Sequence, residues 1–354
     1  MKRRSGLLLC LGCLLTLAGC GAKEQAEQAE LFAMDTVMSL TAYGEQAQEA
    51  LLASQRCIAQ LEQSLSYTRA DSQITALNQA AGSSVTVEPA VGELLEAAIG
   101  YSLGTEGCFE PTVAPLVYLW GFPTDRHTVP TEEAIAELLP LLGSERIAVQ
   151  WTDGIPSVTL DAGQQLDLGG IAKGYASDRV EAIYRQNGIA SGIASLGGNV
   201  FACGTKPDGS LWRIAIQDPQ QTGEYAGTLD LADAYAVTSG SYQRYFLGED
   251  GTVYHHIIDP ATGAPSQSDL LSVTVVADAN RSTEETVGSG TMCDALSTAL
   301  FVMGSERASE FWRSGRYDFE TVLITKDGRI VVSAGLEDAF ALPEGSEYEV
   351  EYLR

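Results

Sequence analysis

The sequence predicts an α+β protein that folds as one compact domain of mixed helices and sheets, with two lobes as an alternative arrangement. Helical and strand patterns both recur along the 354 residues, without the strict βαβ alternation expected of a parallel sheet. No internal repeat and no Pro/Ser-rich linker follows residue 30, so a second independent domain is not indicated.

The first residues have the order of a secretory signal. Lys2, Arg3 and Arg4 precede an apolar run over 7–17, which is shorter than the roughly 20 residues of a membrane-spanning helix. The run ends in Leu-Ala-Gly before Cys20, and this order resembles the bacterial lipobox, in which the cysteine thiol is acylated. A plain signal peptide or a membrane anchor is the alternative.

We therefore expect a lipoprotein signal peptide over 1–19, the lipidated Cys20 with a polar, flexible tether over 20–30, and the functional domain over 31–354. The formal net charge of −26 should repel nucleic acid and anionic lipid, so partners of these two kinds are excluded. Contact with the membrane would come from the lipid, and we expect an exported protein on the outer face of the cytoplasmic membrane.

The chain has seven cysteines, of which four lie beyond Cys20. They are widely spaced and form no CxxC pair, so neither a zinc site nor a disulfide scaffold is indicated. Buried free thiols are favoured, and a disulfide stays open because export permits one. These four residues are Cys57, Cys108, Cys203 and Cys293.

The elements of the first half follow from periodicity. A strand is expected over 32–44 and an amphipathic helix over 46–65. Further helical patterns cover 71–81, 89–103 and 131–142, and short strands are expected near 146–150, 156–160 and 164–167.

In the second half, a helix is expected over 170–187. Two helices, 290–302 and 305–314, are expected to be separated by Gly304, which is a natural helix C-cap. The expected strands lie near 199–203, 211–217, 235–238, 253–258, 270–278, 320–326 and 329–334.

The stretch "DLGGIAKGYASDRV" (167–180) predicts an anion site. Gly169 and Gly170 would lie at a helix N-terminus, where unpaired N–H groups and the helix dipole favour negative charge, and Lys173 adds a cation. A tight turn without a ligand is the alternative.

The stretch "GTMCDALSTALFVMG" (290–304) places Asp294 and Thr298 on one helix face. A carboxylate and a hydroxyl are hard oxygen ligands that suit Mg²⁺ together with water and substrate phosphate. In the alternative interpretation Asp294 is an N-cap and Thr298 bonds its own helix.

Two of the three histidines stand together in "YHHIIDPATGAP" (254–265). An imidazole near a carboxylate can be a general base, and a structural histidine bonded to the Asp-Pro-Ala-Thr-Gly turn is the alternative. The aromatic residues of "CFEPTVAPLVYLWGF" (108–122) could flank a flat ring or belong to the core.

Eight stretches, taken in their order along the chain, make it similar to the ApbE family of FAD:protein FMN transferases over about residues 32–340. The resemblance implies an ApbE-like, T-fold-like domain. The stretches are "MDTVMSL", "SQITALN", "CFEPTVAPLVYLWGF", "DLGGIAKGYASDRV", "SLGGNVFACG", "TSGSYQRYF", "HIIDPATGAP" and "CDALSTALFVMG".

The resemblance implies that FAD is bound as a substrate with Mg²⁺, and that its FMN half is transferred to a Thr or Ser hydroxyl of a target protein with release of AMP. The implied target is an exported or membrane redox protein. The implied metal ligands are Asp294, Thr298 and the backbone carbonyl of Gly170. The implied flavin and phosphate contacts are Met34, Cys108, Phe109, Glu110, Asp167, Lys173 and Ile258.

The family's active histidine corresponds to His256. Our hypothesis is that His256 positions or deprotonates the target hydroxyl, and that Asp259 orients it. Glu110 stands where the family usually has Asp, Cys108 and Cys293 where it has smaller residues, and Ser241 where Asp is frequent. An FAD pyrophosphatase and a non-catalytic FAD-binding lipoprotein are the alternative functions.

Overall fold

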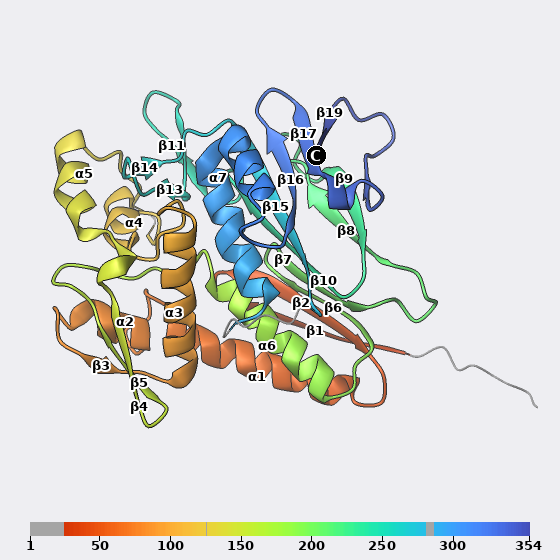
Figure 1. The fold of residues 1–354 in the computed structure, drawn as a ribbon, viewed down its shortest axis with the longest axis horizontal. Helices are drawn as coiled ribbons and strands as arrows, with labels where there is room; N and C mark the ends of the chain where they lie inside the picture. Colours follow the sequence, from red (N-terminus) through yellow and green to blue (C-terminus); the bar gives the residue numbers. More distant parts are fainter. Residues whose placement is uncertain (1–24, 125, 281–286) are drawn as a thin grey trace, which may run out of the picture.

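The computed structural model describes residues 25–124, 126–280 and 287–354 (Figure 1). Its centre is a nine-stranded sheet, antiparallel throughout except for the parallel pair β17–β19. In spatial order the strands are β1 (Ala26–Ala33), β2 (Thr36–Tyr43), β6 (Ser191–Leu196), β7 (Asn199–Gly204), β10 (Ala234–Gly240), β15 (Leu270–Asp278), β16 (Glu320–Thr325), β17 (Arg329–Ser333) and β19 (Glu349–Leu353).

Helices cover one face of this sheet and enclose the main hydrophobic core (Figure 1). They are α1 (Ala47–Leu65), α6 (Ala172–Gln186) and α7 (Ser289–Arg313). Helix α3 (Pro89–Gly104) packs against α7 and adds apolar residues to the same core. Helices α6 and α7 approach so closely that a Cβ atom on Gly174 would lie only 2.3 Å from the carbonyl oxygen of Gly290. Gly304 has a φ of 79°, so the predicted break between two helical segments is confirmed as a kink within α7.

A small sheet covers part of the opposite face and forms a second core with it. Its order is β18 (Phe340–Ala341), β9 (Tyr225–Leu231) and β8 (Trp212–Gln217), which makes β8 an edge strand. The residues of β8 are alternately buried and exposed, as expected for a strand with one face on a core.

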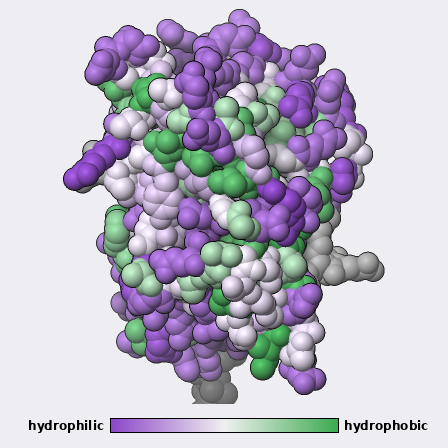
Figure 2. Space-filling model, turned by 90° about the vertical axis from the view of Figure 1, so that its left-hand side faces the viewer, coloured by the Kyte–Doolittle hydropathy of each residue, from purple (hydrophilic) through white to green (hydrophobic). Residues whose placement is uncertain are grey.

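The remaining elements pack beside the helical layer, on the left in Figure 1. Figure 2 views this side and shows hydrophobic residues scattered over a largely hydrophilic surface. Trp120 donates from its indole N–H to the carbonyl of Gly263 at 2.8 Å, which fixes α4 to the 258–265 hairpin. The elements are α2 (Gln73–Gln79), α4 (Ala114–Trp120), α5 (Glu132–Leu138), β3 (Val85–Thr86), β4 (Ala148–Thr152), β5 (Ile155–Thr159), β11 (Tyr245–Leu247), β12 (Val253–His255), β13 (Ile258–Asp259) and β14 (Ala264–Pro265), with 3₁₀ turns at Leu139–Leu141 and Ser144–Arg146. A third 3₁₀ turn, Ala334–Leu336, follows β17 and belongs to the second core.

The prediction of one compact α+β domain is confirmed. No helix in the described part of the chain is long and apolar enough to cross a membrane. The four cysteines beyond Cys20 form no disulfide within the described residues, and all but Cys57 are buried.

The predicted tether is wrong from Ala26 onward. Residues 26–33 form β1, which pairs with β2 from Ala26↔Tyr43 to Ala33↔Thr36. The side chains of β1 are mostly polar, which suits an edge strand whose side chains stay largely exposed. Backbone hydrogen bonds to β2 hold the strand in place. The signal peptide and Cys20 lie outside the described residues.

Three other expectations need correction. The single strand at 32–44 is a hairpin, because Met34 and Asp35 adopt φ values of 50° and 59° and turn the chain. The strand expected at 164–167 is a loop with one isolated bridge, and the strand at 253–258 is interrupted between β12 and β13. Helix α4 was not predicted from its short aromatic stretch, nor were β6 and β9.

Asp178 on α6 holds the start of α7. Its half-buried carboxylate accepts hydrogen bonds from the backbone N–H groups of Gly288, Gly290 and Thr291 and from the Thr291 hydroxyl. Burial raises the pKa of Asp178 to about 6, although the bonds from Thr291 and Gly290 act in the opposite direction. Asp178 thus caps α7 from a neighbouring helix, one turn ahead of Asp294.

Asp178→Ala should lower the free energy of unfolding by about 2 kcal/mol, because it leaves several helix N-terminal donors without their acceptor. Urea unfolding followed by circular dichroism measures this loss. Asp230→Ala is the matched control: it removes an exposed ion pair with Arg213 and should cost no more than about 1 kcal/mol. Equal losses in the two variants would contradict the capping role.

Candidate functional site

A cavity of about 950 Å³ opens at the end of the main sheet, where α6 and α7 meet. A cavity of this size suits a cofactor-sized ligand. Of the catalytic, flavin and metal residues suggested by the sequence, all but Asp259 line it. The lining ones are Met34, Cys108, Phe109, Glu110, Asp167, Gly170, Lys173, His256, Ile258, Asp294 and Thr298.

The glycine-rich turn uses part of the predicted anion site for its own hydrogen bonds. Asp167 accepts a hydrogen bond from the Gly169 N–H at 2.7 Å, and the Leu168 carbonyl accepts from the N–H groups of Ile171 and Ala172. These three donors, at the start of α6, are therefore already used inside the turn. Burial raises the pKa of Asp167, which the Gly169 N–H and Arg244 oppose.

Gly170 allows the turn to approach α7. A Cβ atom at this position would lie 3.1 Å from Thr298 Oγ1 and 3.3 Å from the Phe109 ring. Any side chain would therefore crowd both the hydroxyl and the aromatic wall of the cavity.

Asp294 is 2% exposed and lies in the second turn of α7, whose N-cap is Gly288, so the interpretation of Asp294 as an N-cap is wrong. Its Oδ2 accepts a hydrogen bond from the Gly174 N–H at 2.8 Å. Its Oδ1 lies 3.4 Å from Asn199 Nδ2 and 3.9 Å from Lys173 Nζ. The carboxylate is thus anchored through one oxygen and turns the other toward cationic and polar groups.

The oxygens around Asp294 fit a hard cation. The hydroxyl of Thr298 lies beside Gly170 and 3.5 Å from Ser239 Oγ, and Asn199 Oδ1 is buried without a hydrogen-bond partner in the described residues. No group of three or more His, Cys, Asp or Glu side chains able to hold a metal occurs in the described part of the chain. One carboxylate with neutral oxygens matches the few protein ligands that Mg²⁺ usually takes.

His256 has a defined tautomer. Its Nδ1 lies 3.2 Å from the Arg244 carbonyl oxygen, which can only accept, so a neutral ring carries its proton on Nδ1 and leaves Nε2 as an acceptor. Burial, reinforced by the Arg244 guanidinium, lowers the pKa of His256 to about 3. The imidazole is therefore neutral at physiological pH, and its unprotonated Nε2 can accept a hydrogen bond.

The orienting role proposed for Asp259 is wrong. The Arg244 carbonyl orients the His256 ring, while Asp259 Oδ1 accepts the Ala261 N–H at 2.9 Å within its own turn. The structural role considered for a histidine fits His255, whose Nε2 lies 2.9 Å from the Ser266 carbonyl.

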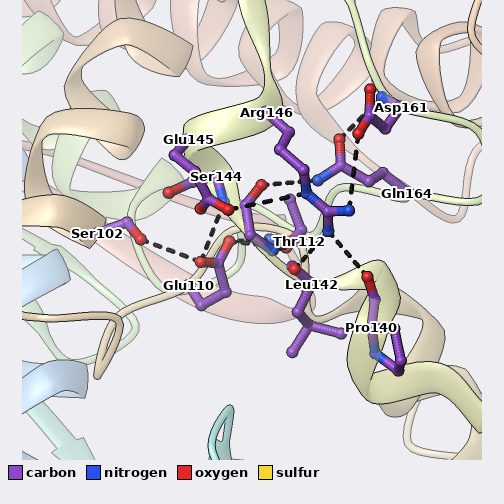
Figure 3. A network of polar contacts seen from close by, with 11 residues as sticks. Ser102, Glu110, Thr112, Pro140, Leu142, Ser144, Glu145, Arg146, Asp161 and Gln164 are labelled. Carbon is purple, nitrogen blue, oxygen red and sulfur yellow. Dashed lines mark hydrogen bonds and ion pairs between the residues drawn. The ribbon is translucent and has the colours of Figure 1, made fainter.

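Glu110 lines the cavity, but its carboxylate serves the protein (Figure 3). It accepts from the hydroxyls of Ser102 and Thr112 and from the backbone N–H groups of Thr112 and Ser144. Four donors saturate most of the acceptor positions of a carboxylate. Glu110 therefore fixes the loop that carries Cys108 and Phe109.

Several groups at the cavity were not expected from the sequence, and Tyr67 and Arg244 are two of them. Tyr67 lines it, and its hydroxyl lowers the pKa of Asp167. Arg244 lines it as well, with its guanidinium 3.8 Å from Asp35. Arg244 lies in the "TSGSYQRYF" stretch, whereas no spacing signal marks Tyr67.

The comparisons agree with the fold and the site. The ApbE family model matches residues 34–323. An FAD:protein FMN transferase of Treponema pallidum is 34% identical, with 95% of this chain and 94% of the relative covered. One of Klebsiella pneumoniae is 35% identical, with 83% and 87% covered. The crystal structure of an ApbE protein of Thermotoga maritima matches with a TM-score of 0.79 at 29% identity, covering 89% of this chain and 99% of that one. The chain therefore belongs to the ApbE family.

Proposed function

We propose that this protein transfers the FMN moiety of FAD to a hydroxyl of a target protein. The names of its relatives support the activity. The observation that carries the proposal is that one cavity contains a buried carboxylate, Asp294, and a neutral imidazole, His256, whose Nε2 can accept a proton.

In the reaction, the Thr or Ser oxygen of the target forms a bond to the phosphorus of the FMN half, and the bond from that phosphorus to the bridging oxygen breaks. AMP leaves with the bridging oxygen, and the hydroxyl proton passes to His256 Nε2. A neutral hydroxyl is a weak nucleophile, so an acceptor for its proton increases its reactivity. Phe109, Met34 and Ile258 supply apolar surface for the flavin.

Mg²⁺ fits the same cavity. Asp294, Thr298 and the carbonyl of Gly170 would hold it, and a bound ion would neutralise charge on the pyrophosphate. Lys173 lies 3.9 Å from Asp294 Oδ1 and would add positive charge on the same side. Together they explain how a chain of net charge −26 could bind a dinucleotide.

Asp294→Asn should lower the rate of transfer by on the order of a hundredfold or more and remove its dependence on Mg²⁺, because the amide keeps the shape but loses the charge. The measurement is the gain of FMN minus water on an acceptor flavodomain by mass spectrometry, with and without EDTA. Asp327→Asn, an exposed carboxylate beside Arg329, is the matched control. An Asp294→Asn enzyme with unchanged Mg²⁺ dependence would refute the metal assignment, and FMN and AMP without labelled acceptor would favour a pyrophosphatase.

His256→Asn should reduce transfer by roughly a hundredfold or more, because the amide can still donate to the Arg244 carbonyl but has no acceptor in place of Nε2. The substitution also tests the pKa. The unfolded His pKa is about 6.5 and the folded value is about 3, so the folded state binds fewer protons in this window and stability falls as the pH decreases through it.

Urea unfolding at several pH values should therefore show a smaller acid loss of stability in His256→Asn than in the original chain. His127→Asn changes a histidine that does not line the cavity and serves as the control. Full transfer activity in His256→Asn would exclude the proton-accepting role.

We also propose that the protein is exported and anchored by a lipid on Cys20, on the outer face of the cytoplasmic membrane. The order of the basic, apolar and Leu-Ala-Gly-Cys segments supports this. The target would then be an exported or membrane redox protein.

Cys20→Ala should abolish incorporation of radiolabelled palmitate and move the protein from the membrane fraction to the soluble fraction. Cys57→Ala leaves the signal segment unchanged and is the control. Palmitate labelling that persists in Cys20→Ala would contradict the lipid assignment.

A further inference from the structure

The cavity extends past the groups that face the pyrophosphate and reaches the small sheet. Four successive residues of β8, 214–217, line it, together with Val200 and Thr238 of the main sheet. Successive residues of a strand point to opposite faces. A cavity that touches all four therefore runs along the edge of β8.

That edge has no strand beside it in the described part of the chain. β8 pairs with β9 on one side only, from Trp212↔Leu231 to Gln217↔Tyr225. An unpaired edge presents backbone N–H and C=O groups that accept a further strand. The outer residues of β8 include Ala215, which is exposed and offers little steric hindrance.

The surface next to this edge is also uncovered. β1 and β2 extend the main sheet beyond the small sheet (Figure 1). Val37 pairs with Phe32, and the two side chains are 67% and 71% exposed. Because side chains alternate along a strand, Val37 and Ser39 lie on the same face of the main sheet. Ser39 pairs with Ser195, which lines the cavity, so the exposed apolar pair lies on the face that carries Ser195. An exposed apolar pair beside a cavity indicates a surface that binds another molecule.

We propose that the acceptor protein presents its Thr or Ser on an extended segment that adds to β8 as a fourth strand of the small sheet, while Phe32 and Val37 contact the body of the acceptor. This inference rests on the proposed transfer function. The segment lies along 214–217 and delivers its hydroxyl to the cavity that contains Asp294 and His256. Recognition is therefore mainly through backbone hydrogen bonds, with side chains adding specificity.

The test uses the full chain in detergent with FAD, Mg²⁺ and a library of twelve-residue peptides that each carry one central threonine. The best-labelled peptide, identified by its gain of FMN minus water, is resynthesised with single N-methylated amides. Methylation of every second amide should raise KM about tenfold. Only alternate N–H groups of an added strand face β8, and a methyl group on one of these removes one hydrogen bond. The intervening methylations should have little effect.

Hydrogen exchange supplies an independent readout on the enzyme itself. Amides of 212–217 should gain protection when the peptide is added, whereas those of β9 in the middle of the small sheet should not change. Ala215→Pro should raise KM for the peptide, and Gln150→Pro on β4, an edge strand of another sheet, is the matched control. The N-methyl series needs no enzyme variant and decides the question even where Ala215→Pro does not fold.

Several results would overturn the proposal. Labelling without two-residue alternation in the N-methyl series would exclude strand addition while leaving transfer intact. Protection of β8 before the peptide is added, with a dimeric mass in solution, would show that a second copy covers the edge. Cleavage of FAD without any labelled peptide would overturn the proposed transfer function, and this inference with it.

Discussion

The close contact between α6 and α7 is the constraint on which the site depends. Gly174 and Gly290 let the two helices approach until the Gly174 N–H reaches Asp294 Oδ2 at 2.8 Å. A buried carboxylate is costly unless it is hydrogen-bonded, so this contact makes an ionised Asp294 compatible with its burial. Asp178 reinforces the same junction one turn earlier by capping α7. The Asp294 carboxylate is thus positioned by helix packing rather than by a loop.

The end of β10 joins the two sides of the cavity. Ser239 faces the helices, with its hydroxyl 2.8 Å from Ser297 and 3.5 Å from Thr298. The preceding residue, Thr238, faces the other way and lies 2.8 Å from Thr274. One strand end therefore contacts the hydroxyls of Ser297 and Thr298 on α7 and also borders the space beside β8. In the proposed reaction, this alternation would let a nucleotide bind on one side while a polypeptide approaches from the other.

The sequence predicted most regular elements, and nearly all the catalytic, flavin and metal residues that it suggested line the cavity, because the motifs are local. The 290–304 pattern fixes the face shared by Asp294 and Thr298, and Gly304 marks the kink. What failed depends on tertiary contacts. β1 is a strand because β2 pairs with it, the N–H groups before α6 are used by Asp167 and Leu168, and the partner of His256 comes from Arg244, twelve residues away. No periodicity encodes such pairings.

A transferase that uses a proton acceptor such as His256 must still favour a protein hydroxyl over water. The Nε2 lone pair could accept a proton from the protein hydroxyl or from water. The charge around Asp294 would likewise assist attack on the phosphorus by either nucleophile. Discrimination therefore has to come from position, because a hydroxyl fixed near the phosphorus reacts as if it were present at a very high concentration. A strand bound along β8 would supply that fixation through its backbone. The same argument would account for a cavity that extends from Asp294 to β8. In the proposed reaction, the residues that bind the dinucleotide would determine which group is transferred, and the edge strand would determine which acceptor receives it.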